Sequence, residues 1–228
     1  MRYVGFDVGG TKCAVTVATV ENGRVTFEGK RAFPTPEAWQ EAVEQMFCAA
    51  EELLGDKRAD ACGFSCGSPL DAEKGIVLAP PNLPTWDHVP VTELAKARFG
   101  IPAFLENDAN ACALAEWRWG AGRGVDNMIF LTFGTGMGAG LILGGRLIRG
   151  ANGNAGEVGH MRLADFGPAG YGKEGSFEGF CSGGGIRQLA ETLSLRERQK
   201  GAPVSMGSGP LTARVVAEAA GRGDPLAL

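Results

Sequence analysis

Several features that mark common classes of protein are missing from this sequence. Basic residues are dispersed, and 22 Lys and Arg against 26 Asp and Glu give a formal charge of −4. Because nucleic-acid binding needs a basic face, we expect no nucleic-acid partner. The six cysteines include no Cys-x-x-Cys pair. In a chain of 228 residues they indicate reduced thiols in a cytoplasmic protein.

Long apolar segments are also scarce. The 19 residues from 127 to 145 carry no charge, which approaches the length of a membrane span. Glycines interrupt this segment and leave only short apolar runs, so a pair of buried strands around a glycine turn explains it better. At the N-terminus, Asp7 falls where a signal peptide needs apolar residues. We therefore expect no association with a membrane.

Glycine, in contrast, is abundant. The chain has 36 glycines, 10 before residue 120 and 26 from Gly120 onward, which is about twice the usual share of ~7%. They follow no Gly-X-Y period, and this excludes collagen. The second half of the chain is therefore expected to be rich in tight turns or in close contacts between backbone and ligand.

Hydrophobic periodicity predicts an α/β protein in which a unit of the ββαβα type occurs twice. A proline-rich loop, 65–90, is long enough inside a compact domain to indicate a function. Two three-strand meanders, each opening on a glycine hairpin, predict two lobes around one cleft, residues 1–120 and 121–228. The predicted elements are strands over 2–8, 13–20, 24–33, 61–64, 103–106, 128–133, 139–143 and 146–148, and helices over 37–54, 92–99, 108–119, 184–195 and 211–220.

Two glycine-rich loops have the composition of phosphate-binding turns. Asp7–Lys12 places a carboxylate at the end of the first strand, and its glycines let backbone N–H groups approach phosphate oxygens. A plain hairpin is the alternative. Gly134–Gly140 is similar but also fits the dinucleotide motif Gly-x-Gly-x-x-Gly. That motif should open a helix, whereas a strand is expected here, so a nicotinamide-linked oxidoreductase is the weaker hypothesis.

Acidic residues and a histidine are the candidates for chemistry. Asp108 ends a predicted strand and opens a helix, where it either caps the helix or acts as a general base at the edge of the sheet. Glu157 and His160 stand three residues apart among glycines, which suits hydrogen bonds to vicinal hydroxyl groups. A buried histidine with satisfied hydrogen bonds is the alternative. Glu178 is a further candidate for the same site.

Together these motifs resemble the ROK family of repressors, open reading frames and sugar kinases. The resemblance implies the actin-like ATPase fold, which is ribonuclease H-like, with the second lobe incomplete. The family's repressors carry an additional N-terminal DNA-binding segment, whereas this chain starts directly at the first strand, so a kinase is implied. The motifs stand in the family's order and spacing: DVGGTK (7–12), PNLPTW (81–86), LENDANACALAEW (105–117), FGTGMGAGLILGGRL (133–147) and NAGEVGH (154–160).

The resemblance implies glucokinase-like phosphorylation of a hexose by ATP and Mg²⁺. Asp108 would take the proton from the 6-OH, and Asp7 would position Mg²⁺ through water. N-acetylmannosamine or another hexose is an alternative substrate, and a sugar-binding protein without catalysis is a rival function. The implied hexose ligands are Asn82, Asn107, Glu157, His160 and Glu178, with Ser65 and Gly67; the implied nucleotide ligands are Asp7, Gly9, Gly10, Thr11, Lys12, Thr135 and Gly136.

The sequence departs from the family pattern in two places. Many members bind Zn²⁺ through one His and three Cys, but here the cysteine positions hold Ala169, Tyr171 and Ser176. We therefore expect no zinc and expect His160 to be oriented by another residue, Tyr171. Family members also continue beyond residue 228 through an adenosine-binding segment. From this we expect weak nucleotide binding and, through exposed apolar surface and a sheet edge, a homodimer.

Overall fold

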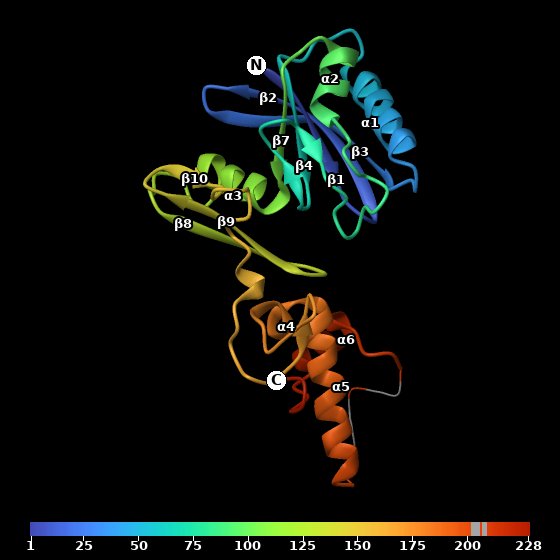
Figure 1. Ribbon diagram of the computed structural model, residues 1–228, viewed down its shortest axis with the longest axis vertical. Helices are drawn as coiled ribbons and strands as arrows, with labels where there is room; N and C mark the ends of the chain where they lie inside the picture. Colours follow the sequence, from blue (N-terminus) through green and yellow to red (C-terminus); the bar gives the residue numbers. More distant parts are fainter. Residues whose placement is uncertain (202–205, 207–208) are drawn as a thin grey trace. The chain divides into compact units, whose positions relative to one another are not determined.

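The protein is a mixed α/β chain, as the sequence predicts (Figure 1). A computed structural model describes residues 1–201, 206 and 209–228. The chain forms two compact units, one of Met1–Phe130 and Gly140–Ala155 and the other of Leu131–Ala139 and Gly156–Leu228. Within the described residues, no helix is both long and apolar enough to cross a membrane.

A five-stranded sheet forms the centre of the first unit. β1 pairs antiparallel with β2 and parallel with β4, and β4 pairs parallel with β7. The three parallel strands therefore end at the same edge of the sheet, which is where α/β sheets place their ligands. In spatial order the strands are β3 (Arg24–Pro34), β2 (Lys12–Glu21), β1 (Arg2–Val8), β4 (Ala61–Cys66) and β7 (Ala103–Asn107).

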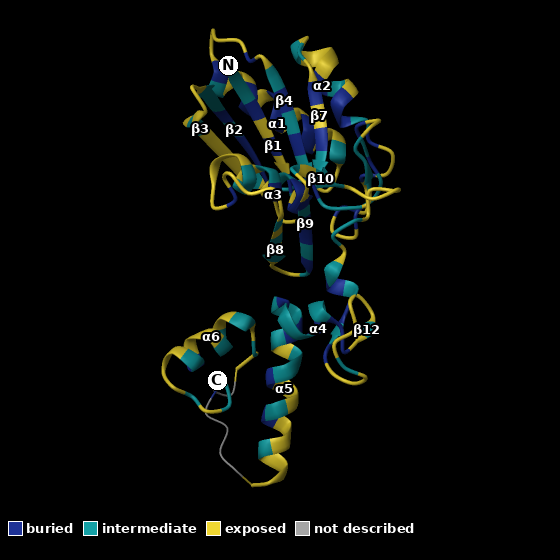
Figure 2. Ribbon diagram, turned by 90° about the vertical axis from the view of Figure 1, so that its left-hand side faces the viewer, coloured by how far each residue is buried: buried dark blue, intermediate teal, exposed yellow. Residues whose placement is uncertain are grey.

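The alternation of side chains along β1 decides which face of this sheet is buried. Phe6 is 1% exposed and stacks on Phe64 of β4, with ring centroids 4.5 Å apart. Figure 1 shows α1 (Trp39–Leu54) and α2 (Val91–Phe99) together on this side, and the buried residues of the sheet are dark blue in Figure 2. Since successive side chains alternate, Asp7 points to the opposite face.

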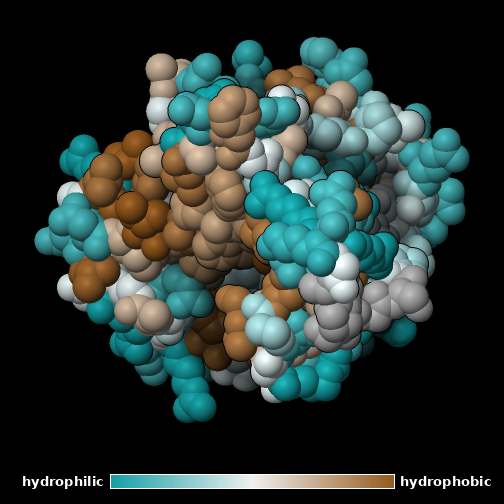
Figure 3. All heavy atoms as spheres, turned by 90° about the horizontal axis from the view of Figure 1, so that it is seen from below, coloured by the Kyte–Doolittle hydropathy of each residue, from teal (hydrophilic) through white to brown (hydrophobic). Residues whose placement is uncertain are grey.

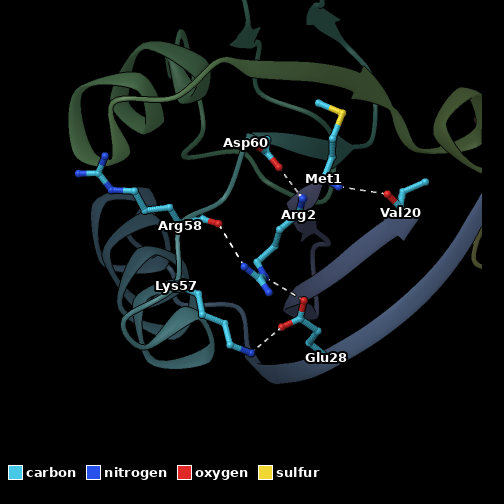
Figure 4. A network of polar contacts seen from close by, with 7 residues as sticks. All are labelled: Met1, Arg2, Val20, Glu28, Lys57, Arg58 and Asp60. Carbon is cyan, nitrogen blue, oxygen red and sulfur yellow. Dashed lines mark hydrogen bonds and ion pairs between the residues drawn. The ribbon is translucent and has the colours of Figure 1, made fainter. Parts of the chain in front are cut away.

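Polar contacts fix the start of β1 (Figure 4). The backbone N of Arg2 donates to Asp60 Oδ2 at 2.6 Å, and its Nε donates to Glu28 Oε1 at 2.8 Å. Lys57 Nζ lies 3.1 Å from the other oxygen of Glu28. The Arg2 and Lys57 cations lower the pKa of the Glu28 carboxyl. This network anchors the strand whose opposite end carries Asp7.

The proline-rich segment 65–90, which the sequence predicts as a loop, also contains short regular elements and a buried side chain. It contains a small hairpin of β5 (Leu70–Asp71) and β6 (Ile76–Val77), and its Trp86 is fully buried. β6 also forms an isolated bridge with Val89. The apolar residues between the prolines belong to the core of the first unit, so this segment is held by packing as well as by its turns.

A second, three-stranded sheet repeats the meander that opens the chain. Its order is β10-β9-β8, and helix α3 (Asp108–Trp119) precedes it in sequence. Its bounds, and those of the elements that follow, are β8 (Met128–Phe133), β9 (Met137–Leu143), β10 (Arg146–Ile148), the 3₁₀ turn η1 (Val158–His160), β11 (Ala169–Gly170), β12 (Lys173–Glu174), α4 (Phe177–Cys181), α5 (Gly183–Gln199) and α6 (Ala213–Gly221).

Apolar side chains remain at the surface in both units. β8 is the edge strand of its sheet, and Ile129 and Phe133 are 62% and 56% exposed. Figure 3 shows hydrophobic side chains gathered on the face seen from below. The sequence predicts self-association from surfaces of this kind, and the homodimer stays a prediction. A groove in the second unit is lined by apolar residues of α5, α6 and the C-terminus, among them Ile186, Leu189, Leu193, Val216 and Leu226.

Candidate functional site

Two carboxylates occupy the edge at which the parallel strands of the first unit end. Asp7 is the penultimate residue of β1, and Asp108 follows β7 directly as the first residue of α3. Burial raises the pKa of Asp7, and the charge of Asp108 raises it further, against the smaller lowering effects of Lys30 and Lys12. Both carboxylates present oxygen atoms, the type of ligand that hard divalent cations take.

The cap of α3 is Asn107 and not Asp108. The Asn107 side chain accepts a hydrogen bond from Asn110 N at 3.1 Å, and its amide donates to Ser68 Oγ at 3.0 Å. Asp108 is exposed, and its Oδ1 accepts from Ala109 N at 2.8 Å. The capping role that either residue type could fill thus belongs to Asn107. The carboxylate of Asp108 is left available for chemistry.

An ion pair that the sequence did not predict holds this corner. Glu106 Oε1 accepts from the backbone N of Asn107 at 3.0 Å and from Asn110 Nδ2 at 3.1 Å. Glu106 Oε2 accepts from Arg149 Nε and Nη2 at 2.8 and 2.6 Å. Because the Glu106 side chain is only 14% exposed, the pair is partly shielded from water. Both oxygens therefore fix the backbone and side chains around Asp108.

The first glycine-rich loop lies against the proline-rich segment. A Cβ at Gly10 would lie 2.5 Å from the Cβ of Asn82 and 2.6 Å from its carbonyl oxygen. Only glycine permits this approach. Asn82, implied for the hexose, therefore packs on the loop implied for the phosphates. Ser65 is the register partner of Asp7 across β1 and β4, and Gly67 follows the end of β4, so both lie at the same edge.

The second glycine-rich loop joins two strands and opens no helix. Gly134 N donates to Gly136 O at 2.9 Å in the turn between β8 and β9, and Thr135 is exposed. A dinucleotide-binding motif needs a helix at this point, so the structure lacks the context on which the oxidoreductase hypothesis depended. Glu178 Oε2 accepts a hydrogen bond from Met137 N at 3.0 Å, which joins a residue implied for the hexose to this loop.

His160 is accessible and is held by its neighbours. Its Nε2 lies 3.7 Å from Glu157 Oε2, and its side chain is 43% exposed, so the alternative of a buried histidine is wrong. The ring packs edge-to-face on Tyr171 with centroids 5.2 Å apart, which is the contact that the sequence predicted. Lys173 Nζ donates to the carbonyl oxygen of His160 at 2.6 Å. These contacts position the imidazole.

The three positions at which related sequences carry zinc-binding cysteines do not fit a zinc site here. The backbone N of Ala169 donates to Gln188 Oε1 at 3.0 Å, and Gln188 Nε2 donates to the carbonyl oxygen of Ala169 at 2.8 Å. Ser176 caps α4 by accepting from Gly179 N at 3.0 Å, and Tyr171 contacts His160. Among the residues that the structure describes, no group of three or more His, Cys, Asp or Glu could hold a metal ion.

We predict that Lys173→Met will raise the KM for the hexose about tenfold with little change in kcat. The substitution removes the ammonium that holds the His160 carbonyl, while the side chain keeps its apolar length; a lost hydrogen bond to a charged group is worth roughly this factor. Steady-state kinetics measures it, and exposed Lys200→Met serves as the control. An unchanged KM would contradict this role of Lys173. Metal analysis of the wild-type protein tests the expectation of no zinc, which one zinc per chain would contradict.

The structure therefore groups the implied residues by unit. In the first unit, the edge of the sheet brings together Asp7, Asp108 and Asn107, and Asn82 packs on the glycine turn that follows β1. In the second unit, Glu178 contacts the turn after β8. Glu178 also lies close in space to Gly159, the residue of η1 that stands between Glu157 and His160 in the sequence.

The strand order and the two glycine turns define the class to which this protein belongs. This chain has a sheet ordered β3-β2-β1-β4-β7 and a second meander of β8, β9 and β10, and its structural neighbours are ROK kinases of the actin-like ATPase fold. The ROK family model matches residues 3–228. The chain belongs to the ROK family.

Relatives of known name agree with this assignment. The chain is 32% identical over 230 residues to a glucokinase of Streptomyces coelicolor, covering 99% of this chain and 71% of the relative. A ROK hexokinase structure from Thermus thermophilus is 34% identical with a TM-score of 0.75, covering all of this chain and 71% of that one. A ROK glucokinase from Streptomyces griseus, solved with glucose and AMPPNP, is 34% identical with a TM-score of 0.74. The match covers 100% of this chain and 73% of that one.

Proposed function

We propose that this protein transfers the γ-phosphoryl group of ATP to the 6-OH of a hexose, with Asp108 as the general base. The observation that carries the proposal is the exposed carboxylate of Asp108 beside Asp7, at a helix whose cap is supplied by Asn107. The names of the relatives support the reaction class, since they include glucokinases and a hexokinase.

Each step of the transfer has a candidate group. Because Asp108 Oδ1 already accepts from Ala109 N, Oδ2 is the oxygen that would take the proton of the hexose 6-OH. The freed oxygen attacks the γ-phosphorus as the bond to the β-phosphate oxygen breaks, and ADP leaves. Asp7 would hold Mg²⁺ through water, and the ion would neutralise charge on the phosphates when bound.

The remaining residues would bind the two substrates. The backbone of Gly9 and Gly10, with Thr11 and Lys12, would receive phosphate oxygens in the first unit, and Thr135 and Gly136 would do so in the second. Hydroxyl groups of the hexose would be bound by hydrogen-bond donors and acceptors, from side chains and, at Gly67, from the backbone. We assign this role to Asn82, Asn107 and Gly67 of the first unit and to Glu157, His160 and Glu178 of the second.

The test is hexose-dependent release of ADP from Mg-ATP. The panel contains glucose, mannose, fructose, allose, N-acetylglucosamine and N-acetylmannosamine, each compared with a reaction without sugar. We expect turnover with at least one hexose, with glucose first among them. The sugar with the highest turnover decides between the hypothesis of a glucokinase-like enzyme and the alternative of an N-acetylmannosamine kinase. Hexose binding measured by calorimetry, with no turnover for any sugar, would overturn the proposal in favour of a sugar-binding protein.

A further inference from the structure

We propose that Glu178 couples the hexose site to the second phosphate loop, so that one carboxylate makes binding of the sugar and of the nucleotide interdependent. This inference rests on the proposed function and adds a positioning role to a residue assigned there to the hexose. The coupling lies within the second unit, between α4 and the turn that joins β8 to β9.

The carboxylate is seated directly against the loop. Glu178 Oε2 accepts from Met137 N at 3.0 Å. A Cβ at Gly136 would lie 3.0 Å from the same oxygen, and a Cβ at Gly159 would lie 3.4 Å from it. Glycine at both positions allows the carboxylate to reach the backbone of the turn. Any group bound at Gly136 is therefore a close neighbour of this charge.

The loop has a second anchor on the same segment of chain. Gly183 N, at the start of α5, donates to Gly134 O at 2.9 Å, and Ser182 N donates to Glu178 O at 2.9 Å. The α4–α5 corner thus holds the turn at both of its ends. One anchor joins backbone to backbone and is fixed, whereas the other is a side chain whose partners can change.

The two carboxylate oxygens have different surroundings. Oε2 is engaged by Met137 N, while Oε1 has no hydrogen-bond partner in the parts of the chain that the structure describes. A carboxylate accepts several hydrogen bonds, so Oε1 is free to receive a hydroxyl group of the hexose. The bare charge beside Gly136 opposes a phosphate there. A hydroxyl donated to Oε1 weakens this repulsion and steadies the side chain, which prepares the loop for the nucleotide.

Two variants separate the charge of the Glu178 side chain from its length. Glu178→Gln keeps the length and an oxygen that accepts from Met137 N, but removes the charge. Glu178→Asp keeps the charge, but is one methylene too short for the loop. Glu174→Gln is the matched control, because that exposed side chain makes no hydrogen bond or ion pair with any described residue. Circular dichroism establishes that each variant is folded.

The measurement is the Kd of Mg-AMPPNP by calorimetry, with and without saturating glucose. For the wild type and for Glu174→Gln, we expect glucose to tighten AMPPNP binding at least about fivefold, the lower range of coupling between sites. Glu178→Gln is expected to bind AMPPNP more tightly than the wild type without sugar, with little further gain from glucose. Glu178→Asp is expected to bind it weakly in both conditions.

Two results would overturn the inference, and they are distinguishable from failure of the proposed function. If the Glu178 variants show the same effect of glucose as the wild type, the carboxylate does not couple the sites. If the wild type binds AMPPNP equally with and without glucose yet turns over hexose, the coupling is absent and the proposed function stands. If the wild type binds AMPPNP and glucose but releases no ADP from ATP with any hexose, the proposed function fails.

Discussion

Replacing Asp108 by asparagine is expected to lower kcat for hexose-dependent ADP release by about 10³-fold, within the range for loss of a general base. The affinity for the hexose should change by less than about threefold, because the amide keeps the size of the carboxyl group. It also keeps an oxygen that accepts from Ala109 N. Since Asn107 caps α3, the substitution leaves the helix intact.

The control for this prediction is Asp56→Asn, which removes an exposed carboxylate outside the site. That variant should turn over hexose at the rate of the wild type. Equal kcat for Asp108→Asn and Asp56→Asn would contradict the assignment of Asp108. A loss of activity accompanied by a lower melting temperature would instead show that Asp108 serves the fold.

Asp7→Asn is expected to change activity and stability in opposite directions. Activity should fall about 10²-fold, since a group that holds charge near the transferred phosphate is lost. Stability should rise. Burial and the charge of Asp108 raise the pKa of Asp7 in the folded protein, so its ionised form is less favourable there than in the unfolded chain. The carboxylate therefore opposes folding at neutral pH, and the amide does not.

Thermal unfolding as a function of pH measures this second effect. The higher Tm of Asp7→Asn should be largest at pH 7 and should shrink as the pH falls through the raised pKa of Asp7, because the wild-type carboxylate then becomes protonated in the folded protein. Added Mg²⁺ should raise the Tm of the wild type more than that of the variant. A variant that is less stable than the wild type at pH 7 would contradict the repulsion between Asp7 and Asp108.

The sequence predicts most of the first unit because local signals agree there. Alternation of apolar residues marks the buried face of β1, and Asn22 and Gly23, both with positive φ, mark the hairpin between β2 and β3. The start of α3 is predicted as well. Which residue caps it is not, since Asn and Asp are equally favoured caps and Asn107 and Asp108 are adjacent.

Contacts between residues that are far apart in the sequence could not be predicted from it. Glu106 pairs with Arg149, 43 positions away, and Glu178 reaches Met137 across 41 positions. Neither pair has a local signal, because each depends on where the sheets bring the chain together. Likewise, the prolines in 65–90 predict a loop but do not show that Trp86 of this segment is buried in the core. The roles of the site residues came from the resemblance to a family rather than from spacing.

The most direct test of the central claim is to follow the phosphoryl group itself. The wild-type chain is incubated with Mg-ATP and glucose, and the products are identified by ³¹P NMR with coupling to the protons of the sugar. We expect phosphate to appear on the oxygen of carbon 6 in step with ADP, and Asp108→Asn to slow its appearance about 10³-fold. ADP accompanied only by inorganic phosphate, or a phosphate on another hydroxyl group, would contradict the central claim.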